Sequence, residues 1–252
     1  MTLTIDVWRQ DGPDVPGRFE RHQVTDATPE MSLLELLDRL NDQLVGEGRE
    51  PVAFDHDCRE GICGTCGVTV DGRPHGPVPN TPTCHQHVRS FADGDRVTLE
   101  PFRAAGFRVV RDLVVDRSAL DRIIAAGGTV SVDTGTAPDA DAQPVHHDVA
   151  EQAMDFAACI GCGACVAACP NAAAHLFTGA KLAQLALLPQ GAVERTERAQ
   201  SMTAVMEEHF GSCTTYGECV EVCPAGIPLV AIARLNREVV RSRFGRRRSG
   251  RR

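Results

Sequence analysis

Cysteine is the residue type of this chain with the clearest capacity for chemistry, because eleven cysteines fall into three groups at metal-ligand spacing. The first group consists of Cys58, Cys63, Cys66 and Cys84. Its x4 and x2 spacing is typical of a [2Fe–2S] site, where one short loop supplies three thiolates and a separate segment supplies the fourth. Gly61, Gly64 and Gly67 are expected to let this loop turn tightly and aim backbone N–H groups at sulfur.

A zinc ion is the alternative occupant of the first group. Zinc sites favour paired Cys-x2-Cys units, and only Cys63 and Cys66 form one, which favours the iron–sulfur cluster. His85 and His87 flank Cys84 and would allow a mixed Cys/His site, but four cysteines already suffice. Cys84 is the least constrained of the four ligands, because 17 residues separate it from the loop.

The second and third groups resemble each other. The second group consists of Cys159, Cys162, Cys165 and Cys169, followed by Pro170. In this bacterial ferredoxin run the first three cysteines bind one [4Fe–4S] cube and the fourth reaches another cluster. The third group consists of Cys213, Cys219 and Cys223, followed by Pro224. When the two groups are aligned, Tyr216 stands where the second group has a cysteine.

The substitution at Tyr216 predicts two different clusters. The [4Fe–4S] cube would be held by Cys159, Cys162, Cys165 and Cys223. The other cluster would be held by Cys169, Cys213 and Cys219, and a cube without a thiolate at one corner readily lacks that iron, which predicts [3Fe–4S]. A [4Fe–4S] cube with a tyrosinate ligand is the alternative, and it requires a phenol of ordinary pKa about 10 to lose its proton. All eleven cysteines are then used, and none is left for a disulfide or a nucleophile.

Two kinds of surroundings are predicted to position these groups. Residues 1–105 predict a small α+β domain, because apolar residues alternate near 3–7 and the Ser32–Glu35 capping box opens an apolar-faced helix near 32–45. Further strands are expected near 67–70 and 96–100. Residues 106–148 predict a connector with short strand and helix signals, then an extended loop.

The remainder of the chain predicts helices. They are expected within residues 149–245, near 149–157, 172–187, 192–209 and 228–242. His146 and His147, which precede them, could bind metal but are expected to be solvated loop residues. Residues 246–252 predict a basic tail.

Composition narrows the range of partners. Aromatic residues make up 4% of the chain, which argues against a base-stacking nucleic-acid surface. Seven arginines and no acidic residue stand in 241–252, so this end could contact anionic lipid or an acidic partner, or could be a solubilising end. We find no run of 18 apolar residues and no leader-like N-terminus, and we therefore expect a cytoplasmic chain in which clustered cysteines bind metal.

The order of the motifs resembles the iron–sulfur subunit of succinate dehydrogenase and fumarate reductase over nearly the whole chain. The matching segments are CREGICGTCG at 58–67, CIGCGACVAACP at 159–170 and CTTYGECVEVCP at 213–224. The resemblance implies a plant-type ferredoxin (β-grasp) domain followed by a helical, bacterial-ferredoxin-like domain. It implies electron transfer from FAD in a flavoprotein subunit through [2Fe–2S], [4Fe–4S] and [3Fe–4S] to quinone at a membrane-anchor subunit. It also implies a peripheral position on the cytoplasmic face of the bacterial plasma membrane, and no substrate-level catalytic residue in this chain.

Three departures from the family pattern concern the first cluster and the quinone site. The segment RPHGPVPNTP lengthens the gap before Cys84 and predicts a longer hairpin tip. Ala174 stands where many members have a Trp that lines the quinone site, and Thr214 stands where some have His. His175 could carry protons there or could simply be a packed residue.

Two other functions remain open at this point. A soluble ferredoxin-like carrier would need little more than a shell around its clusters, so the size of the chain argues against it. A fumarate reductase with a non-quinone acceptor, such as a thiol, would be expected to bring extra cysteine-rich domains. The sequence leaves the direction of the reaction open.

Overall fold

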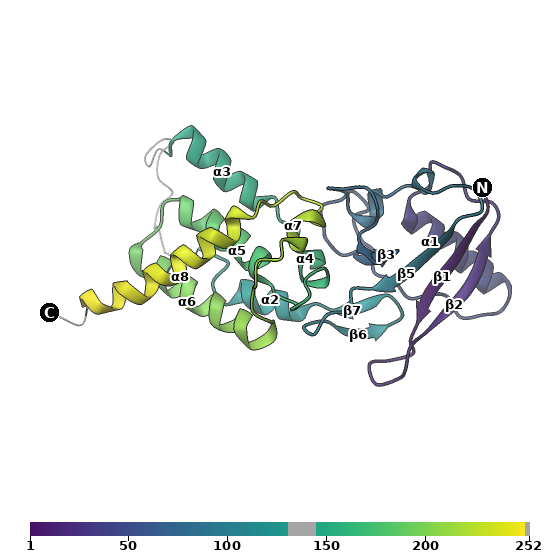
Figure 1. The fold of residues 1–252 in the computed structure, drawn as a ribbon, viewed down its shortest axis with the longest axis horizontal. Helices are drawn as coiled ribbons and strands as arrows, with labels where there is room; N and C mark the ends of the chain where they lie inside the picture. The colour runs from purple at the N-terminus through teal and green to yellow at the C-terminus, as the bar shows by residue number, and fades with distance from the viewer. Residues whose placement is uncertain (131–144, 250–252) are drawn as a thin grey trace.

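The computed structural model describes residues 1–130 and 145–249, so the second half of the predicted connector and the last residues of the basic tail lie outside it. The described molecule is elongated, with strands gathered toward the N-terminus and helices toward the C-terminus (Figure 1). The sequence therefore folds as a mixed α+β chain in which the two classes of element are segregated.

A five-stranded sheet forms the N-terminal half, in the order β2-β1-β5-β3-β4. Its strands are β1 (Leu3–Arg9), β2 (Arg18–Val24), β3 (Val68–Val70), β4 (Arg73–Pro74) and β5 (Arg96–Pro101). β1 runs antiparallel to β2 and parallel to β5, while β3 pairs antiparallel with both β4 and β5. The strands predicted near 3–7, 67–70 and 96–100 are confirmed. β2 was not predicted, because this edge strand is mostly exposed and reads as polar.

Helix α1 (Leu33–Gly46) supplies the other half of the first core. The predicted capping box is confirmed: the Glu35 backbone N–H donates to Ser32 Oγ, and the Ser32 N–H donates to the Glu35 carboxylate. One face of α1 is buried at Leu33, Leu34, Leu36, Leu37, Leu40 and Leu44. These leucines pack in the same core as the inward residues of β1 and β5, which fixes the sheet against the helix.

The segment after the sheet contains the expected short elements. It forms a hairpin of β6 (Arg108–Arg111) and β7 (Val114–Asp116), followed by helix α2 (Ser118–Ala125). Leu120 and Ile123 of α2, with Phe107 before the hairpin, belong to the core of the helical half. This segment is therefore packed into the core of the helical half and links that half to the sheet.

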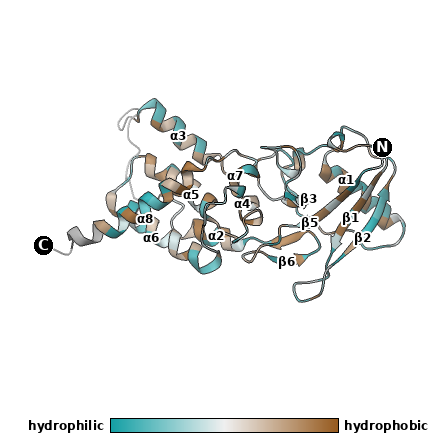
Figure 2. Cartoon of the chain, viewed as in Figure 1, coloured by the Kyte–Doolittle hydropathy of each residue, from teal (hydrophilic) through white to brown (hydrophobic). Residues whose placement is uncertain are grey.

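Six helices form the C-terminal part of the described chain. They are α3 (His147–Ala157), α4 (Ala164–Ala167), α5 (His175–Leu187), α6 (Ala192–His209), α7 (Glu218–Glu221) and α8 (Val230–Ser249). The four predicted helices are confirmed with shifted ends, and α5 begins at His175 because the chain turns through the Ala172 positive-φ conformation first. The apolar helix α5 packs against α3, α6 and α8, and hydrophilic residues are frequent in the coloured turns of α8 (Figure 2).

The two halves have separate hydrophobic cores that meet near the cysteine loops. Cys66 and Cys84 belong to the first core, and Cys162, Cys165 and Cys223 belong to the second. Among the described residues, no helix combines the length and apolar character needed to cross a bilayer.

Candidate cofactor-binding sites

The first cysteine group converges at the edge of the N-terminal sheet. Cys66 lies immediately before β3 and is buried, and Cys84 lies in the short 3-10 helix Thr83–His85 and is buried too. Cys58 and Cys63 lie on the half-exposed loop between α1 and β3. The side chains of Cys66 and Cys84 hydrogen-bond to each other, and Cys63 interacts with Cys58. The structure thus places the four predicted cysteines as neighbouring pairs, Cys66 with Cys84 and Cys63 with Cys58.

The thiols of this group differ in how readily they ionise. The hydrogen bond from Cys66 lowers the pKa of Cys84 to about 6 and correspondingly raises the pKa of Cys66. Burial opposes ionisation of Cys63, but hydrogen bonds from Thr65 and the interaction with Cys58 outweigh it and lower the pKa of Cys63 to about 7. Two thiols here can therefore become thiolates near neutral pH, which is the form that binds metal.

Hydrogen-bond donors of the loop point at the sulfurs, as the glycine pattern predicts. The Glu60 backbone N–H donates to Cys58 Sγ over 3.3 Å. Cys63 Sγ accepts from the Thr65 hydroxyl over 3.1 Å and from the Thr65 backbone N–H over 3.5 Å. Such donors stabilise negative charge on sulfur and so suit an iron–sulfur cluster.

The glycines of this loop have two different roles. Gly61 and Gly64 adopt positive φ angles of 74° and 70°, as expected for a tight turn. Gly67 was expected to do the same and does not: it is absent from the positive-φ conformation. A Cβ atom on Gly67 would lie 2.3 Å from the Phe102 ring, so glycine is required there by packing.

Four cysteines from both halves of the helical motif line one cavity. The cavity is small, about 20 Å³, and its lining includes Cys159, Cys162, Cys165 and Cys223. This is the set predicted for the [4Fe–4S] cube, with Cys223 joining from the third group. Burial raises the pKa of Cys162 to about 12 and raises the pKa values of Cys159 and Cys165. A bound cationic metal would favour the thiolate form of these buried thiols.

The remaining three cysteines line a neighbouring cavity, which is also small, about 20 Å³. Its lining includes Cys169, Cys213 and Cys219, the set predicted for the [3Fe–4S] cluster, together with Tyr216. Burial raises the pKa of Cys219, and the Thr215 backbone N–H donates to Cys213 Sγ over 3.4 Å. Tyr216 is 65% exposed. A largely solvated phenol is a weak candidate for a buried tyrosinate ligand, which favours the three-ligand prediction.

The two cavities are adjacent within the fold. Leu176, at the start of α5, lines both of them. Cys165 lies on α4 and Cys169 lies just beyond its C-terminus, so one short helix sends ligands to both cavities. Cysteines of one sequence motif therefore line two different cavities, because Cys165 and Cys169 lie on consecutive turns of the chain that face different cavities.

Histidines that the sequence left open fall into three environments. His85 is exposed, and His87 forms an isolated β-bridge with Ser32. His146 and His147 are 75% and 79% exposed, as expected of solvated residues, but they are the N-cap and the first residue of α3 and not loop residues. His175 lines the cavity of Cys169, Cys213 and Cys219, and burial lowers the pKa of His175.

Sequence reasoning missed several residues that support the cysteine loops. Arg59 pairs with Asp38 of α1 at 2.6 Å and fixes the first loop to the helix. The Asn171 side-chain amide donates to the Ser212 carbonyl over 3.0 Å and to the Thr214 hydroxyl over 2.8 Å. Of the missed residues, Thr65 alone had a local signal, since it is a hydroxyl residue between two cysteines.

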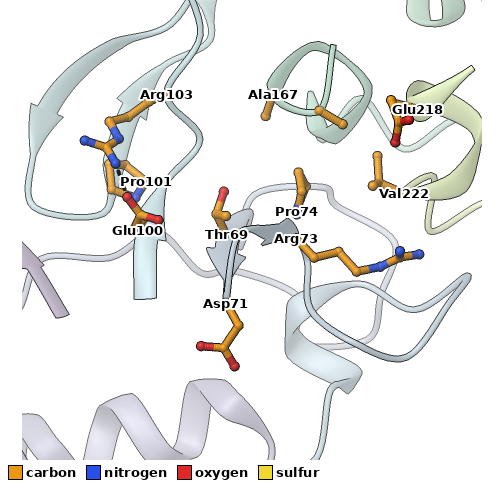
Figure 3. A pocket seen from close by; sticks show the side chains of 12 residues that line it. Thr69, Asp71, Arg73, Pro74, Glu100, Pro101, Arg103, Ala167, Glu218 and Val222 are labelled. Atoms are coloured by element: carbon orange, nitrogen blue, oxygen red, sulfur yellow. Dashed lines mark hydrogen bonds and ion pairs between the residues drawn. The ribbon is translucent and has the colours of Figure 1, made fainter. Parts of the chain in front are cut away.

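A wider cleft lies apart from the cysteines, between the sheet edge and helices α4 and α7 (Figure 3). It has a volume of about 470 Å³ and is open to solvent. Arg73 bridges the two halves here by donating to the Glu221 carbonyl over 2.6 Å, and Glu100 pairs with Arg103. No cysteine or histidine lines this cleft, so the redox chemistry belongs to the three cysteine sites.

Comparison with known proteins agrees with these sites. Residues 4–122 match the 2Fe-2S iron-sulfur cluster binding domain, and residues 158–227 match the 4Fe-4S dicluster domain. The chain is 30% identical to the succinate dehydrogenase iron-sulfur subunit of Bacillus subtilis, over 94% of this chain and 92% of that protein. It is 28% identical to the fumarate reductase iron-sulfur subunit of Wolinella succinogenes, over 94% of this chain and 97% of that protein.

A solved structure agrees at the level of the fold. A chain of the Mycobacterium smegmatis Sdh1 complex in the apo form superposes with a TM-score of 0.67 at 22% identity, covering 96% of this chain and 97% of that chain. The chain matches a [2Fe–2S] domain and a [4Fe–4S] dicluster domain, and it is 30% identical to a relative over nearly the full length of both. It therefore belongs to the family of succinate dehydrogenase and fumarate reductase iron–sulfur subunits.

Proposed function

We propose that this chain transfers electrons within a succinate dehydrogenase or fumarate reductase complex by holding three iron–sulfur clusters in a row. The observation that carries the proposal is the grouping of cysteines. The four cysteines assigned to the [4Fe–4S] cluster line one cavity and the three assigned to the [3Fe–4S] cluster line another, and each cavity includes its crossed residue, Cys223 or Cys169. Such crossing is expected of a double-cluster ferredoxin pattern and has no reason to occur around isolated zinc ions.

The proposed ligand sets follow the three sites. The [2Fe–2S] cluster is held by Cys58, Cys63, Cys66 and Cys84. The [4Fe–4S] cluster is held by Cys159, Cys162, Cys165 and Cys223, and the [3Fe–4S] cluster by Cys169, Cys213 and Cys219. We divide the chain into a plant-type ferredoxin (β-grasp) domain at 1–105, a connector at 106–148, a bacterial-ferredoxin-like domain at 149–245 and a basic tail at 246–252.

When bound, these clusters supply one-electron steps that connect a two-electron flavin reaction to an acceptor. The protein holds their sites in a fixed order. Gly64 of the first loop lies close to the Ile160–Cys162 backbone of the second loop. Leu176 lines both the cavity of the proposed [4Fe–4S] ligands and the cavity of the proposed [3Fe–4S] ligands. We expect no general acid, base or nucleophile for succinate among the described residues, and we assign to this chain the positioning and tuning of redox centres.

Apolar side chains are exposed at both ends of this row. Ile62, at the tip of the first loop, is 71% exposed, and Tyr216 and Leu229 beside the third cavity are 65% and 48% exposed. Exposed apolar residues at a redox site suit a partner surface. We assign the first end to a flavoprotein subunit that carries FAD, and the second to a membrane-anchor subunit and quinone. The chain would then lie peripherally on the cytoplasmic face of the bacterial plasma membrane.

The surroundings of the third cavity indicate how quinone is reached. Ala174 is fully buried and offers quinone no ring, and the Thr214 hydroxyl accepts a hydrogen bond from the Asn171 amide that holds it against this chain. We therefore assign most quinone contacts to the anchor subunit, with this chain supplying the electron.

Purification from detergent-solubilised native membranes tests the complex. A tagged chain is expected to bring down a flavoprotein with bound flavin and membrane subunits, and the eluate should reduce a quinone analogue in a succinate-dependent reaction. A chain that elutes alone from the soluble fraction would instead support the free carrier. Activity with a thiol-linked acceptor and not with quinone would support the non-quinone fumarate reductase.

Replacing Thr65 with valine should make the reduction potential of the first cluster more negative. The Thr65 hydroxyl donates to Cys63 Sγ over 3.1 Å, and such a bond favours the reduced, more negative cluster. A loss of about 1 kcal/mol corresponds to roughly 40 mV for one electron. A redox titration followed by EPR measures the shift. Thr69→Val, in the cleft of Figure 3, is the control, and an unchanged potential in Thr65→Val would contradict the role of the hydroxyl.

A further inference from the structure

The first and second cysteine loops touch each other through their backbones. A Cβ atom on Gly64 would lie 2.2 Å from the Ile160 carbonyl oxygen and 2.9 Å from the Cys162 nitrogen. Gly64 stands next to Cys63, and Ile160 stands next to Cys159, so this contact joins the ligand loops directly.

Arg117 joins the same two loops. Its Nη1 atom donates to the Gly64 carbonyl oxygen and, over 3.1 Å, to the Cys162 carbonyl oxygen. Gly64 and Cys162 lie 53 and 45 residues from Arg117 in sequence, so this side chain ties together three distant segments. A guanidinium is suited to this because it is planar, always charged and presents several donors in a fixed geometry.

The position of Arg117 is unfavourable for the helix that carries it. Arg117 is the N-cap residue of α2, and its side chain makes no capping hydrogen bond. Helix N-termini favour Ser, Thr, Asp or Asn, and a cation is disfavoured at the positive end of the helix dipole. Arg117 is a poor N-cap residue, but its side chain satisfies two distant carbonyl oxygens. The junction between the two loops therefore explains why an arginine stands here.

Arg117 supplies positive charge at the junction of the two loops, whereas the nearby His75 does not. His75 is 1% exposed, and burial, with a smaller effect of Arg117, lowers its pKa to about 4, so it is neutral near pH 7. Arg117 also lies beside the second site, because it donates to the Cys162 carbonyl oxygen over 3.1 Å. Its charge therefore acts on a ligand of the second site as well as on the first loop.

We infer that Arg117 is a positioning residue for electron transfer, which fixes the separation of the first and second clusters and places a positive charge between them. The inference rests on the proposed function, because it requires both clusters. Removing the side chain should loosen the Gly64–Ile160 contact. It should also disfavour the reduced, more negative state of each cluster.

Three variants of the full chain in its complex separate these effects. Arg117→Met removes the charge and both hydrogen bonds, while Arg117→Lys keeps the charge but loses the planar fork. Arg122→Met removes an exposed arginine from the same helix, whose side chain bonds only locally to Ser118, and is the matched control. The readouts are iron content, the potentials of the two clusters, and the relaxation broadening of the reduced [2Fe–2S] EPR signal by the reduced [4Fe–4S] cluster.

Arg117→Met is expected to shift both potentials to more negative values and to weaken the broadening, at unchanged iron content. Arg117→Lys should keep potentials near those of the unaltered protein and still weaken the broadening. Unaltered potentials and broadening in Arg117→Met would overturn the inference. If that variant fails to load clusters, unaltered broadening in Arg117→Lys would overturn it. Unaltered protein without a [2Fe–2S] or [4Fe–4S] signal would contradict the proposed function, and the inference with it.

Discussion

Cys223→Ser is expected to remove the [4Fe–4S] cluster and to leave the [2Fe–2S] cluster intact. Cys223 belongs to the third motif in sequence, but in the structure it lines the cavity of Cys159, Cys162 and Cys165. A serine hydroxyl has a far higher pKa than a thiol and is a poor ligand for iron, so the cube loses one corner. The EPR spectrum of the reduced protein should lose the [4Fe–4S] signal, and iron content should fall by as much as about four per chain.

Cys169→Ser is the reciprocal variant and completes this test. Cys169 lies in the second motif but lines the cavity of Cys213 and Cys219. Its replacement should therefore remove the [3Fe–4S] signal of the oxidised protein. Cys219→Ser should behave in the same way and serves as the uncrossed control. The opposite pattern, with Cys169→Ser losing only the [4Fe–4S] signal, would contradict the crossed assignment.

Tyr216→Cys is expected to convert the [3Fe–4S] cluster into a [4Fe–4S] cluster. Tyr216 occupies the sequence position at which the second motif has Cys162, and it lines the cavity of the three-cysteine site. A thiolate there supplies the missing corner, so iron content should rise by about one atom per chain. The EPR signal of oxidised [3Fe–4S] should disappear.

Tyr216→Phe is the matched control for this conversion, because it removes the phenol oxygen and keeps the ring. It should retain the [3Fe–4S] signal and the iron content of the unaltered chain. A change of cluster type in Tyr216→Phe would show that the phenol oxygen is a ligand and would support the tyrosinate alternative.

Local patterns predicted the elements and the grouping of cysteines well. The Ser32–Glu35 capping box is readable within four residues, and the leucines of α1 repeat at helical spacing, so both are set by nearby sequence. The spacing of the second and third motifs predicted which cysteines share a cavity, because each turn of a short helix faces a fixed direction. Their assignment as cluster ligands stays a prediction.

Features that depend on distant contacts could not be predicted. β2 is an edge strand with a mostly exposed, charged surface, and its register with β1 comes from pairing rather than from an apolar pattern. Gly67 looked like a turn residue, but the Phe102 ring from beyond β5 determines its identity. Arg117 has no local signal, since both carbonyls it binds belong to other segments.

The extra segment before Cys84 shows the same division. Its presence was evident from the spacing, but its anchoring was not. Gln86, which is fully buried, donates to the Val78 and Thr81 carbonyls, and the Thr83 backbone N–H donates to His75 Nδ1. These bonds fold the segment back against the residues that flank Cys84. The extra segment is therefore held by hydrogen bonds against the residues of the first cysteine site.

The most direct test of three clusters in one chain is EPR on anaerobically purified protein, oxidised and then reduced with dithionite, together with iron quantification. The account predicts about nine irons per chain, a [3Fe–4S] signal in the oxidised sample and a [2Fe–2S] signal on reduction. An oxidised sample without the [3Fe–4S] signal and with about ten irons would mean a second complete cube. That result would contradict the three-ligand site and would require a non-cysteine ligand at its fourth corner.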